Sequence, residues 1–189
     1  MKFSQFKPAL GKSGLALSIE IERKFLVISD EWRRLVRGSQ RVCQGYLARS
    51  SRGKVRVRRI GAKAFLAVKG SRRGISRAEF EYPIAVQDAE EMLRTLCVRP
   101  VLEKTRYEVV HAGLVWEVDV FTGDAEGLVL AEVELKRTDQ LLDLPSWVGR
   151  EVTQDRRYRS SAIVFRQQTS KPASPIFATA GMGGRHAGS

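Results

Sequence analysis

The chain has few cysteines and no long apolar run, and both shortages limit what it can be. Two cysteines occur, Cys43 and Cys97, and their spacing is not that of a metal site. We therefore expect a reduced, cytoplasmic protein without a disulfide framework. No apolar run approaches the roughly 20 residues that cross a bilayer. No apolar segment of the signal-peptide type precedes Ile19. Neither a membrane-spanning nor a secreted protein is predicted.

Acidic residues are also scarce relative to basic ones. The 189 residues include 33 Lys and Arg but 21 Asp and Glu, so the formal net charge is +12. Residues 1–17 hold three lysines and residues 167–189 hold one Lys and one Arg, with no acid in either segment, which leaves +7 for the part between them. Such a surplus suits an anionic partner, and it does not choose among a phosphate compound, a nucleic acid and a membrane surface.

Length and composition fit a single globular domain. With 43% hydrophobic residues, the chain can bury one core of ordinary size. Residues 1–17 mix Lys, Gly, Ser and scattered apolar residues without a sustained period, and the last 21 residues are mainly Ser, Ala, Gly and Pro. We therefore predict a flexible N-terminal extension over residues 1–17, one domain over residues 18–168 and a disordered tail over residues 169–189.

Alternation with a period of two residues is the main local pattern. Residues 19–26 read I-E-I-E-R-K-F-L, which places Glu20, Glu22 and Lys24 on one face of a strand and mainly apolar residues on the other. Similar alternation recurs along the chain. The predicted strands cover residues 17–27, 41–47, 54–60, 64–69, 77–84, 101–110, 114–121 and 128–136.

Short helices are expected between some of these strands. Ser29 has the character of an N-cap, and Asp88 with Glu91 resembles a capping box. The predicted helices are one from Ser29 that ends at Gly38, one from Asp88 that ends before Pro100, and segments over residues 138–144 and 160–168.

The polar faces of the predicted strands consist almost entirely of Asp, Glu, Lys and Arg. One interpretation is a half-buried sheet whose outer face is wet and carries weak cross-strand ion pairs. The other is a sheet closed into a barrel, with the charged face inside and the apolar face covered by helices. Solvent-facing strands ordinarily also use Thr, Ser and Gln, so the set as a whole favours the barrel.

The charges inside such a barrel would need partners. Two carboxylates about 4 Å apart repel by roughly 4 kcal/mol at an effective dielectric near 20. Glu20 and Glu22, meeting Glu132 and Glu134 across the cavity, would therefore need divalent cations. Clustered Lys and Arg would need an anion of high charge density, and phosphate fits the Arg fork best. Acids that hold metal beside bases that hold phosphate predict a phosphoryl-transfer site.

The motifs also resemble those of a known family. E-I-E-R-K at residues 20–24 is similar to the ExExK signature of the CYTH superfamily, also called triphosphate tunnel metalloenzymes. Two departures are Ala67, where the family often has Thr, and Ser160, where it has Asn. Further matches in order are Q-G-Y-L at 44–47, R-V-R-R at 56–59, V-K-G at 68–70, E-F-E-Y at 79–82, L-E-K-T-R-Y at 102–107, W-E-V-D-V-F at 116–121, L-A-E-V-E-L at 130–135 and E-V-T-x-D-x-x-Y at 151–158.

The resemblance implies an α+β fold: an eight-stranded antiparallel β-barrel, or tunnel, with a charged interior and a few short helices covering its outside. It also implies roles for individual residues. Catalytic roles fall to Lys24, Glu22 and Tyr46, the last by orienting water. The implied ligands of Mg²⁺ or Mn²⁺ are Glu20, Glu22, Glu132 and Glu134. The implied triphosphate-binding residues are Lys24, Arg56, Arg58, Lys69, Lys104, Arg106 and Arg157. The residues implied to support them by pairing, or by metal contact through water, are Glu79, Glu81 and Asp119.

The leading functional hypothesis is a metal-dependent hydrolase that releases the terminal phosphate of a short triphosphate. The substrate we expect first is inorganic tripolyphosphate. The alternatives are a class IV-type adenylate cyclase or thiamine triphosphatase, and a non-catalytic module that binds polyphosphate or nucleotide. The expected partner is a small-molecule triphosphate, with a homodimer left open. Membrane binding is not expected. Nucleic-acid binding is disfavoured because most bases share strand faces with acids.

Overall fold

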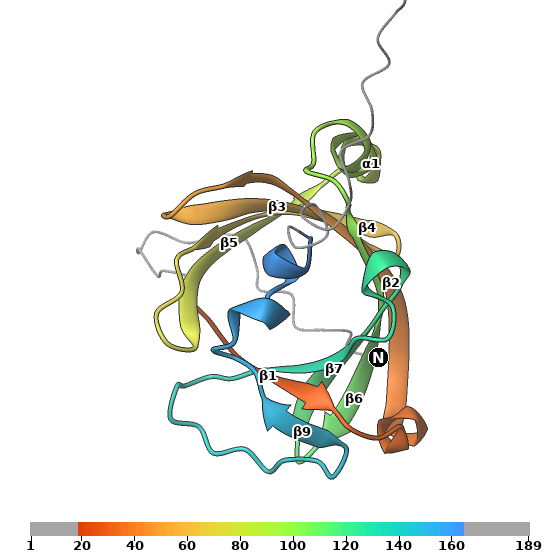
Figure 1. Ribbon diagram of the computed structural model, residues 1–189, viewed down its shortest axis with the longest axis vertical. Coiled ribbons are helices and arrows are strands. Elements are labelled where there is room, and N and C mark those ends of the chain that lie inside the picture. Colours follow the sequence, from red (N-terminus) through yellow and green to blue (C-terminus); the bar gives the residue numbers. More distant parts are fainter. Residues whose placement is uncertain (1–18, 165–189) are drawn as a thin grey trace, which may run out of the picture.

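The computed structural model describes residues 19–164, and these form a closed antiparallel β-barrel (Figure 1). The sheet order is β5-β4-β3-β2-β6-β7-β8-β1, and pairing between β1 and β5 closes the ring. A short additional strand, β9, pairs with the end of β1. The strands are β1 (Ile19–Val27), β2 (Val36–Arg49), β3 (Gly53–Ile60), β4 (Lys63–Gly70), β5 (Ser76–Ile84), β6 (Leu102–His111), β7 (Leu114–Phe121), β8 (Val129–Glu134) and β9 (Val148–Glu151).

The strand registers place the charged faces together on the inside of the barrel. Lys24 of β1 lies opposite Glu132 of β8, and Arg106 of β6 lies opposite Asp119 of β7. Because side chains directly opposite one another share a face of the sheet, these pairings align the charged faces of neighbouring strands. The eight-stranded barrel with a charged interior is therefore confirmed.

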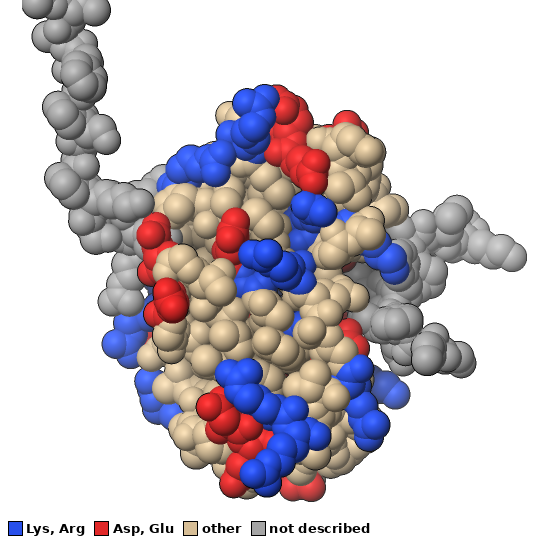
Figure 2. Space-filling model, turned by 90° about the vertical axis from the view of Figure 1, so that its right-hand side faces the viewer, with Lys and Arg blue, Asp and Glu red and all other residues tan. Residues whose placement is uncertain are grey.

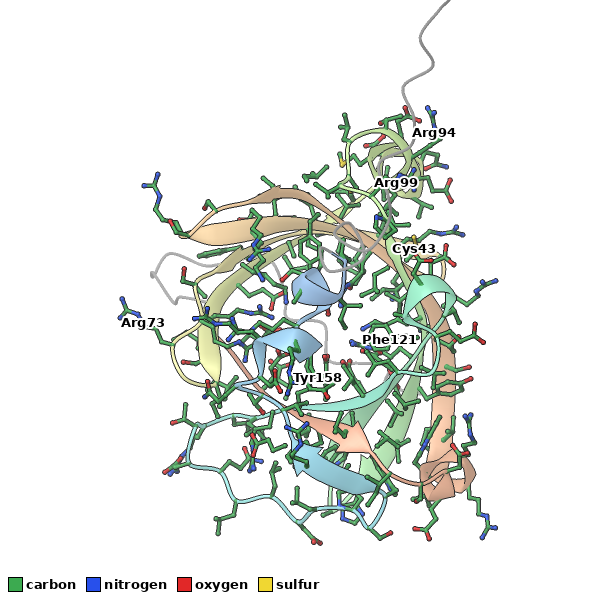
Figure 3. All side chains as sticks on the ribbon, in the orientation of Figure 1. Cys43, Arg73, Arg94, Arg99, Phe121 and Tyr158 are labelled. Carbon is green, nitrogen blue, oxygen red and sulfur yellow. The ribbon has the colours of Figure 1, made fainter. Side chains whose placement is uncertain are left out.

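The interior is not charged along its whole length. At one end the inward face carries an apolar cluster that the sequence pattern did not predict. This inner apolar cluster consists of Tyr46, Leu102, Phe121, Leu130, Val152, Ile163 and Val164. Its last three members come from the segment after β8, so the C-terminal end of the described chain packs into the barrel (Figure 1). In Figure 3 the labelled Phe121 and Tyr158 lie within the ring of strands.

The apolar faces on the outside are buried under short elements. Trp32, Trp116 and Trp147 all belong to one outer core, and each is almost completely buried. Trp32 comes from the 3₁₀ helix η1 (Glu31–Leu35) and its ring packs against that of Tyr107 on β6. A second outer core lies under the helix α1 (Val86–Thr95), as Figure 1 shows. The expected outer covering is thus present over these parts of the barrel.

One outer contact depends on a glycine of the Q-G-Y-L motif. A Cβ atom placed on Gly45 would lie 2.7 Å from both Cβ and Sγ of Cys97, closer than real Cβ atoms approach. Gly45 therefore lets the turn after α1 sit directly against β2. Both cysteines are free thiols, as the composition predicts.

The outside of the wall differs from its inside in how its charges are spread. Figure 2 views one side of the molecule and shows Lys and Arg in small groups beside Asp and Glu, separated by wide uncharged areas. The labelled Arg94 and Arg99 lie outside the ring beside α1 (Figure 3). The face in Figure 2 lacks the dense alternation of acids and bases that the strands carry inside the barrel.

Several predicted helices are wrong in type or position. The segment after Ser29 forms only η1, and Gly38 lies inside β2, which is much longer than expected. This part of β2 is paired with β6, so strand pairing prevails over the helix-capping pattern. The helix α1 begins at Val86 after Ala85 and not at Asp88, and Glu91 pairs with Arg94 instead of capping the helix. Residues 138–144 contain no helix.

The C-terminal helix lies at an unexpected place. A helix begins at Ser160, as predicted, and is described as far as Val164. It lies at the barrel opening and not on the outer surface (Figure 1). The rest of the predicted helix and the two predicted flexible segments, residues 1–17 and 169–189, fall outside the described residues. Within residues 19–164, no helix is long and apolar enough to span a membrane.

Candidate active site

Two strands carry the carboxylates that the sequence assigns to metal. Glu22 of β1 lies directly opposite Glu134 of β8, and Glu132 lies opposite Glu117 of β7. Because β1 and β8 are adjacent strands, the expected metal ligands are neighbours along one wall of the barrel. The prediction that Glu20 and Glu22 meet Glu132 and Glu134 across the cavity is wrong. Like charges directly opposite each other destabilise a sheet, so these carboxylates need compensation. Adjacent strands bring them together without crossing the tunnel.

Basic side chains compensate the two carboxylates of β1. Lys69 Nζ lies 3.1 Å from Glu20 Oε1, and Arg77 also donates to Glu20. Arg72 donates to Glu22 from the loop between β4 and β5. Burial alone would raise the pKa of Glu20, but Lys69 and Arg77 outweigh it and hold the pKa well below its usual range. The carboxylate is thus ionised at neutral pH.

Glu132 has two basic partners inside the barrel. Lys24 Nζ lies 2.5 Å from Glu132 Oε1, and Arg106 Nη2 lies 3.1 Å from Oε2. Burial opposes ionisation of Glu132, yet Lys24 and the nearby Lys104 and Arg106 keep its pKa well below normal. Burial likewise opposes the charge on Lys24, and Glu132 and Glu22 raise its pKa above the ordinary value. Lys24 therefore stays a cation.

Asp119 connects the basic residues of β6. Lys104 donates to Asp119, and Arg106 Nε lies 2.7 Å from its Oδ1. Asp119 is fully buried, and although burial raises its pKa, Arg106 and Lys104 outweigh burial and lower the pKa below normal. This aspartate therefore acts as a fixed anion that holds two predicted phosphate-binding cations in the wall.

The remaining predicted bases line β3 and β4. Arg58 Nη2 lies 2.7 Å from Glu81 Oε2, while Arg56 Nη2 lies 3.4 Å from the same oxygen. Lys69 Nζ lies 2.8 Å from Glu79 Oε1. The predicted supporting acids on β5 thus pair with the predicted phosphate-binding bases, which places them together on one inner wall.

Some donors in this wall have no acceptor among the described residues. The buried Nε atoms of Arg56 and Arg58 make no hydrogen bond there, and neither does Nε2 of the buried Gln44. Gln44 lies opposite Arg58 in the ladder between β2 and β3, so the three groups share the inner face. Unpaired buried donors are costly and call for an acceptor. An anion with several oxygens would supply it.

Burial lowers the pKa of two of the predicted phosphate-binding lysines. Desolvation, followed by the nearby Arg56, lowers the pKa of Lys69 to about 8. Desolvation and the neighbouring Arg106 lower the pKa of Lys104 to about 8 as well. Both lysines are still mainly protonated at neutral pH, but a modest rise in pH would remove their charge.

Tyr46 lies in the inner apolar cluster, next to the charged wall. It is opposite Arg56 in the ladder between β2 and β3 and is almost completely buried. Burial raises the pKa of its phenol above the ordinary value. The phenol therefore keeps its proton at neutral pH and can donate a hydrogen bond, but it is not a base.

Arg157 does not join the tunnel bases. Its guanidinium is exposed and lies 2.7 Å from Asp155 Oδ2, within the turn η3 (Arg156–Tyr158). The expected phosphate contact from Arg157 is therefore not supported, because the turn directs this side chain toward its own N-cap residue. The same turn reaches the tunnel through its backbone, since Tyr158 O accepts from Lys24 Nζ at 3.4 Å.

The sequence assignment missed further bases of this site. The alternation of β5 places Arg77 on the charged face with Glu79, but Arg77 was given no binding role. Lys54 of β3 donates to Ser161 of the C-terminal helix. No periodic pattern marks Arg72, because it lies in the loop between β4 and β5.

A divalent cation fits the acids of this wall in charge and in donor type. Carboxylate oxygens are the ligands that Mg²⁺ and Mn²⁺ prefer. A cation between the opposed Glu22 and Glu134 would also relieve their repulsion. Within the described chain, however, no three metal-ligating side chains converge as a ready cluster, because each of Glu20, Glu22 and Glu132 is turned toward a basic residue. Metal binding would therefore require these ion pairs to rearrange.

Comparison with known proteins agrees with this architecture. The CYTH domain model matches residues 18–165. An inorganic triphosphatase of Acetivibrio thermocellus is 47% identical over 145 residues, covering 77% of this chain and 92% of the relative. An inorganic triphosphatase of Nitrosomonas europaea is 39% identical over 150 residues, covering 77% and 97%.

Solved structures show the same fold. The crystal structure of the inorganic triphosphatase NE1496 superimposes with a TM-score of 0.55 at 35% identity, covering 77% of this chain and 93% of that one. Together with the family match over most of the chain, this agreement identifies the charged barrel: the protein belongs to the CYTH domain family.

Proposed function

We propose that this protein is a divalent-metal-dependent hydrolase that releases the terminal phosphate of a short triphosphate. Inorganic tripolyphosphate is the substrate we propose. The observation that carries the proposal is the inner wall itself. Opposed carboxylates on β1 and β8, which would attract a cation, and buried arginine donors on β3, which need an anion, lie on the inner face of the same barrel. The inorganic triphosphatases among its relatives support the same substrate class.

The bases would bind and hold the substrate. Arg56 and Arg58 each offer an unused buried Nε–H, and Gln44 offers an amide. Guanidinium groups match phosphate oxygens in geometry, and in a buried site their attraction is weakly screened. Lys24 remains charged beside Glu132 and would stabilise negative charge as the terminal phosphate leaves. Asp119 would keep Lys104 and Arg106 oriented.

The metal would be held by Glu22 and Glu134, with Glu20 and Glu132 completing the set. A bound Mg²⁺ or Mn²⁺ supplies Lewis-acid chemistry toward phosphate oxygens and water. If Glu22 and Glu20 held the metal, Arg72 and Arg77 would lose their present ion-pair partners. Both arginines would then be available to bind the oxygens of the triphosphate.

The direct test is phosphate release from tripolyphosphate, ATP, thiamine triphosphate and pyrophosphate, each with Mg²⁺ and with Mn²⁺. We expect tripolyphosphate to be cleaved fastest and only with metal. The Glu132→Gln variant should lose metal-dependent release, and the exposed Glu90→Gln on α1 serves as its matched control. Full metal-dependent activity in Glu132→Gln would contradict the metal assignment.

The alternatives give different products in the same assay. Cyclic AMP and pyrophosphate from ATP would identify an adenylate cyclase of the class IV type. Preferred cleavage of thiamine triphosphate would identify a thiamine triphosphatase. Tight binding of tripolyphosphate with Mg²⁺ and no product would identify a binding module.

We also infer that the enzyme works in the cytoplasm. The two thiols support this, because Cys43 and Cys97 are both free. The panel above, run with both Mg²⁺ and Mn²⁺, tests which of the two metals the enzyme uses.

A further inference from the structure

Two cations at one end of the barrel have no acidic partner. Lys54 lies at the start of β3, and its Nζ donates to the hydroxyl of Ser161 in the C-terminal helix. Arg159 lies directly before that helix, and its buried Nε makes no hydrogen bond within the described chain. Among residues 19–164, neither cation forms an ion pair with a carboxylate. Half-buried cations without such partners call for an anion from outside the chain.

Lys54 extends a row of bases on the inner face of β3. Arg58, Arg56 and Lys54 alternate along the strand, so successive members stand about 6–7 Å apart. The ladder also places Lys54 opposite Lys69 of β4, and side chains directly opposite one another share a face. Arg56, Arg58 and Lys69 are bases that the sequence assigns to the triphosphate. Lys54 is therefore one step beyond them, toward the end of the barrel at which β3 begins.

The C-terminal turn brings Arg159 to the same end of the barrel. The turn η3 and the helix after it lie within the ring of strands (Figure 1), and Ser161 of this helix contacts Lys54. Desolvation, followed by arginines that include Arg72 and Arg77, lowers the pKa of Arg159. Desolvation, followed by arginines that include Arg77 and Arg159, lowers the pKa of Lys54 to about 8. The two cations thus stand near each other and near further arginines.

The nearby carboxylates of β1 are already engaged. They accept hydrogen bonds from Arg72 and Arg77. Lys54 and Arg159 add two positive charges that these ion pairs leave uncompensated. If the carboxylates of β1 held the metal, as proposed above, Arg72 and Arg77 would lose their partners too. An anion at this end of the barrel would then meet four cations.

We propose that Lys54 and Arg159 form an anion subsite beside the C-terminal helix, and that this subsite binds one phosphate group beyond the three of the proposed substrate. A guanidinium matches phosphate oxygens in geometry, and an ammonium adds a point charge. The group is either the fourth phosphate of a linear polyphosphate or a free orthophosphate, because both present the same oxygens. Its place relative to the triphosphate rests on the proposed function, whereas phosphate binding by these two residues does not.

Calorimetric titration of the full-length protein, with a chelator to exclude metal, tests the subsite without hydrolysis. The first arm compares tripolyphosphate with tetrapolyphosphate. If the subsite takes a fourth phosphate, the wild type should bind tetrapolyphosphate about ten-fold or more tightly, because charged hydrogen bonds are added. The second arm adds orthophosphate to the complex with tripolyphosphate. If the subsite takes a free phosphate, that complex should bind orthophosphate as a second ligand.

The Lys54→Gln/Arg159→Gln variant should lose whichever of these two signals the wild type gives. Its affinity for tripolyphosphate should stay within about three-fold of the wild type, because Arg56 and Arg58 remain. The Lys54→Arg/Arg159→Lys variant keeps both charges and should restore the signal.

Two further variants separate the loss of this subsite from a loss of net charge or of folding. Lys63→Gln/Arg94→Gln is the matched control, since it removes one Lys and one Arg from exposed positions, and it should behave like the wild type. The single variant Arg159→Gln leaves the contact between Lys54 and Ser161 in place, so it keeps the test available if the double variant does not fold. It should weaken the signal by at least about three-fold.

Equal affinity of the wild type for the two polyphosphates, with no binding of orthophosphate to the tripolyphosphate complex, would overturn the proposal. A signal that persists in the Lys54→Gln/Arg159→Gln variant would also overturn it. An equal loss in the control would do the same, because the effect would then follow net charge alone. Failure of the proposed function looks different: the wild type would release no phosphate with metal present, while the signal and its loss in the double variant would stay as stated.

Discussion

The ion pairs on the two surfaces of the barrel wall use the same side chains in different surroundings. On the outside, Arg94 lies 2.7 Å from Glu91 with both side chains more than half exposed. On the inside, Lys104 contacts Asp119 with almost no exposure of either side chain. The outer pair is screened by water and can be lost at little cost, whereas breaking the inner pair leaves a buried charge without a partner.

The inner pairs also differ from the outer ones in how they share partners. Asp119 receives both Lys104 and Arg106, and Arg106 continues to Glu117 and Glu132. Arg137 and Asp139, by contrast, form a local pair on an exposed turn. A shared network can hold its members in place and still exchange one partner for another. The proposed binding of a metal ion and a polyanion in the interior would require such an exchange of partners.

Replacing Asp119 by Ala should have the largest effect on stability. Lys104 and Arg106 would lose a buried partner, and we expect the free energy of unfolding to fall by about 3–5 kcal/mol. Urea denaturation measures the change, with Asp139→Ala as an exposed control. A loss for Asp119→Ala as small as that of the control would show that the inner network does not support the fold.

Replacing Lys24 by Ala should have the largest effect on catalysis, and Glu132 keeps Arg106 as a basic partner in this variant. We expect the turnover number to fall by about 10²–10³ because a buried cation beside the leaving phosphate is removed. Arg58→Ala should behave similarly. Steady-state rates on tripolyphosphate measure both, with the outer Arg33→Ala as control. Unchanged turnover in Lys24→Ala would exclude its catalytic role.

A rise in pH should weaken substrate binding and, over the same pH range, increase the free energy of unfolding. The folded-state pKa of Lys69 and Lys104 is about 8, below the value of about 10.4 for an unfolded lysine. Between these values the unfolded chain binds more protons, so these groups contribute stability that increases with pH. Their lost charge should meanwhile raise the dissociation constant of tripolyphosphate about ten-fold from about pH 7.5 to about pH 9.5.

Calorimetric titration at several pH values measures this loss of affinity. Lys69→Arg is the informative variant, because arginine does not lose its proton in this range. It should flatten the pH dependence. A dissociation constant that stays constant to about pH 9.5 in the wild type would mean that these lysines do not contact the substrate.

Replacing Glu91 by Gln on the outer helix should have the smallest effect. Its pair with Arg94 is exposed, and we expect a change of about 0.2–1 kcal/mol at most in the free energy of unfolding. Thermal denaturation at low and high salt measures it. A larger loss of stability that does not depend on salt would contradict the difference between the inner and outer ion pairs.

Most of the barrel and most of its inner wall follow from the sequence pattern. Strict alternation in β1, β3 and β5 determines which side chains share a face, so the pattern by itself assigns Glu20, Lys24 and Arg58 to the charged face. Two faces of opposite character also fit an open, half-buried sheet, and the almost exclusively charged composition of the polar faces is what favours closure. The family resemblance added the roles of these residues.

What the sequence could not specify depends on contacts between distant segments. Gly38 looked like a helix end, but pairing with β6 extends β2 through it. Arg157 looked like a phosphate ligand, but its turn pairs it with Asp155. The inner apolar cluster joins Leu102 and Phe121 to Val164, which no local pattern connects. Arg72 reaches Glu22 from a loop without any period.

The central claim is that the inner face, and not the basic outer surface, binds the triphosphate. Calorimetric titration of tripolyphosphate in the presence of Mg²⁺ tests it most directly when Arg58→Ala and Arg94→Ala are compared with the wild type. The account predicts that Arg58→Ala weakens binding at least about ten-fold, since a buried charged hydrogen bond is lost, while Arg94→Ala binds like the wild type. Equal affinity in the Arg58→Ala variant and the wild type, or an equal loss in both variants, would contradict it.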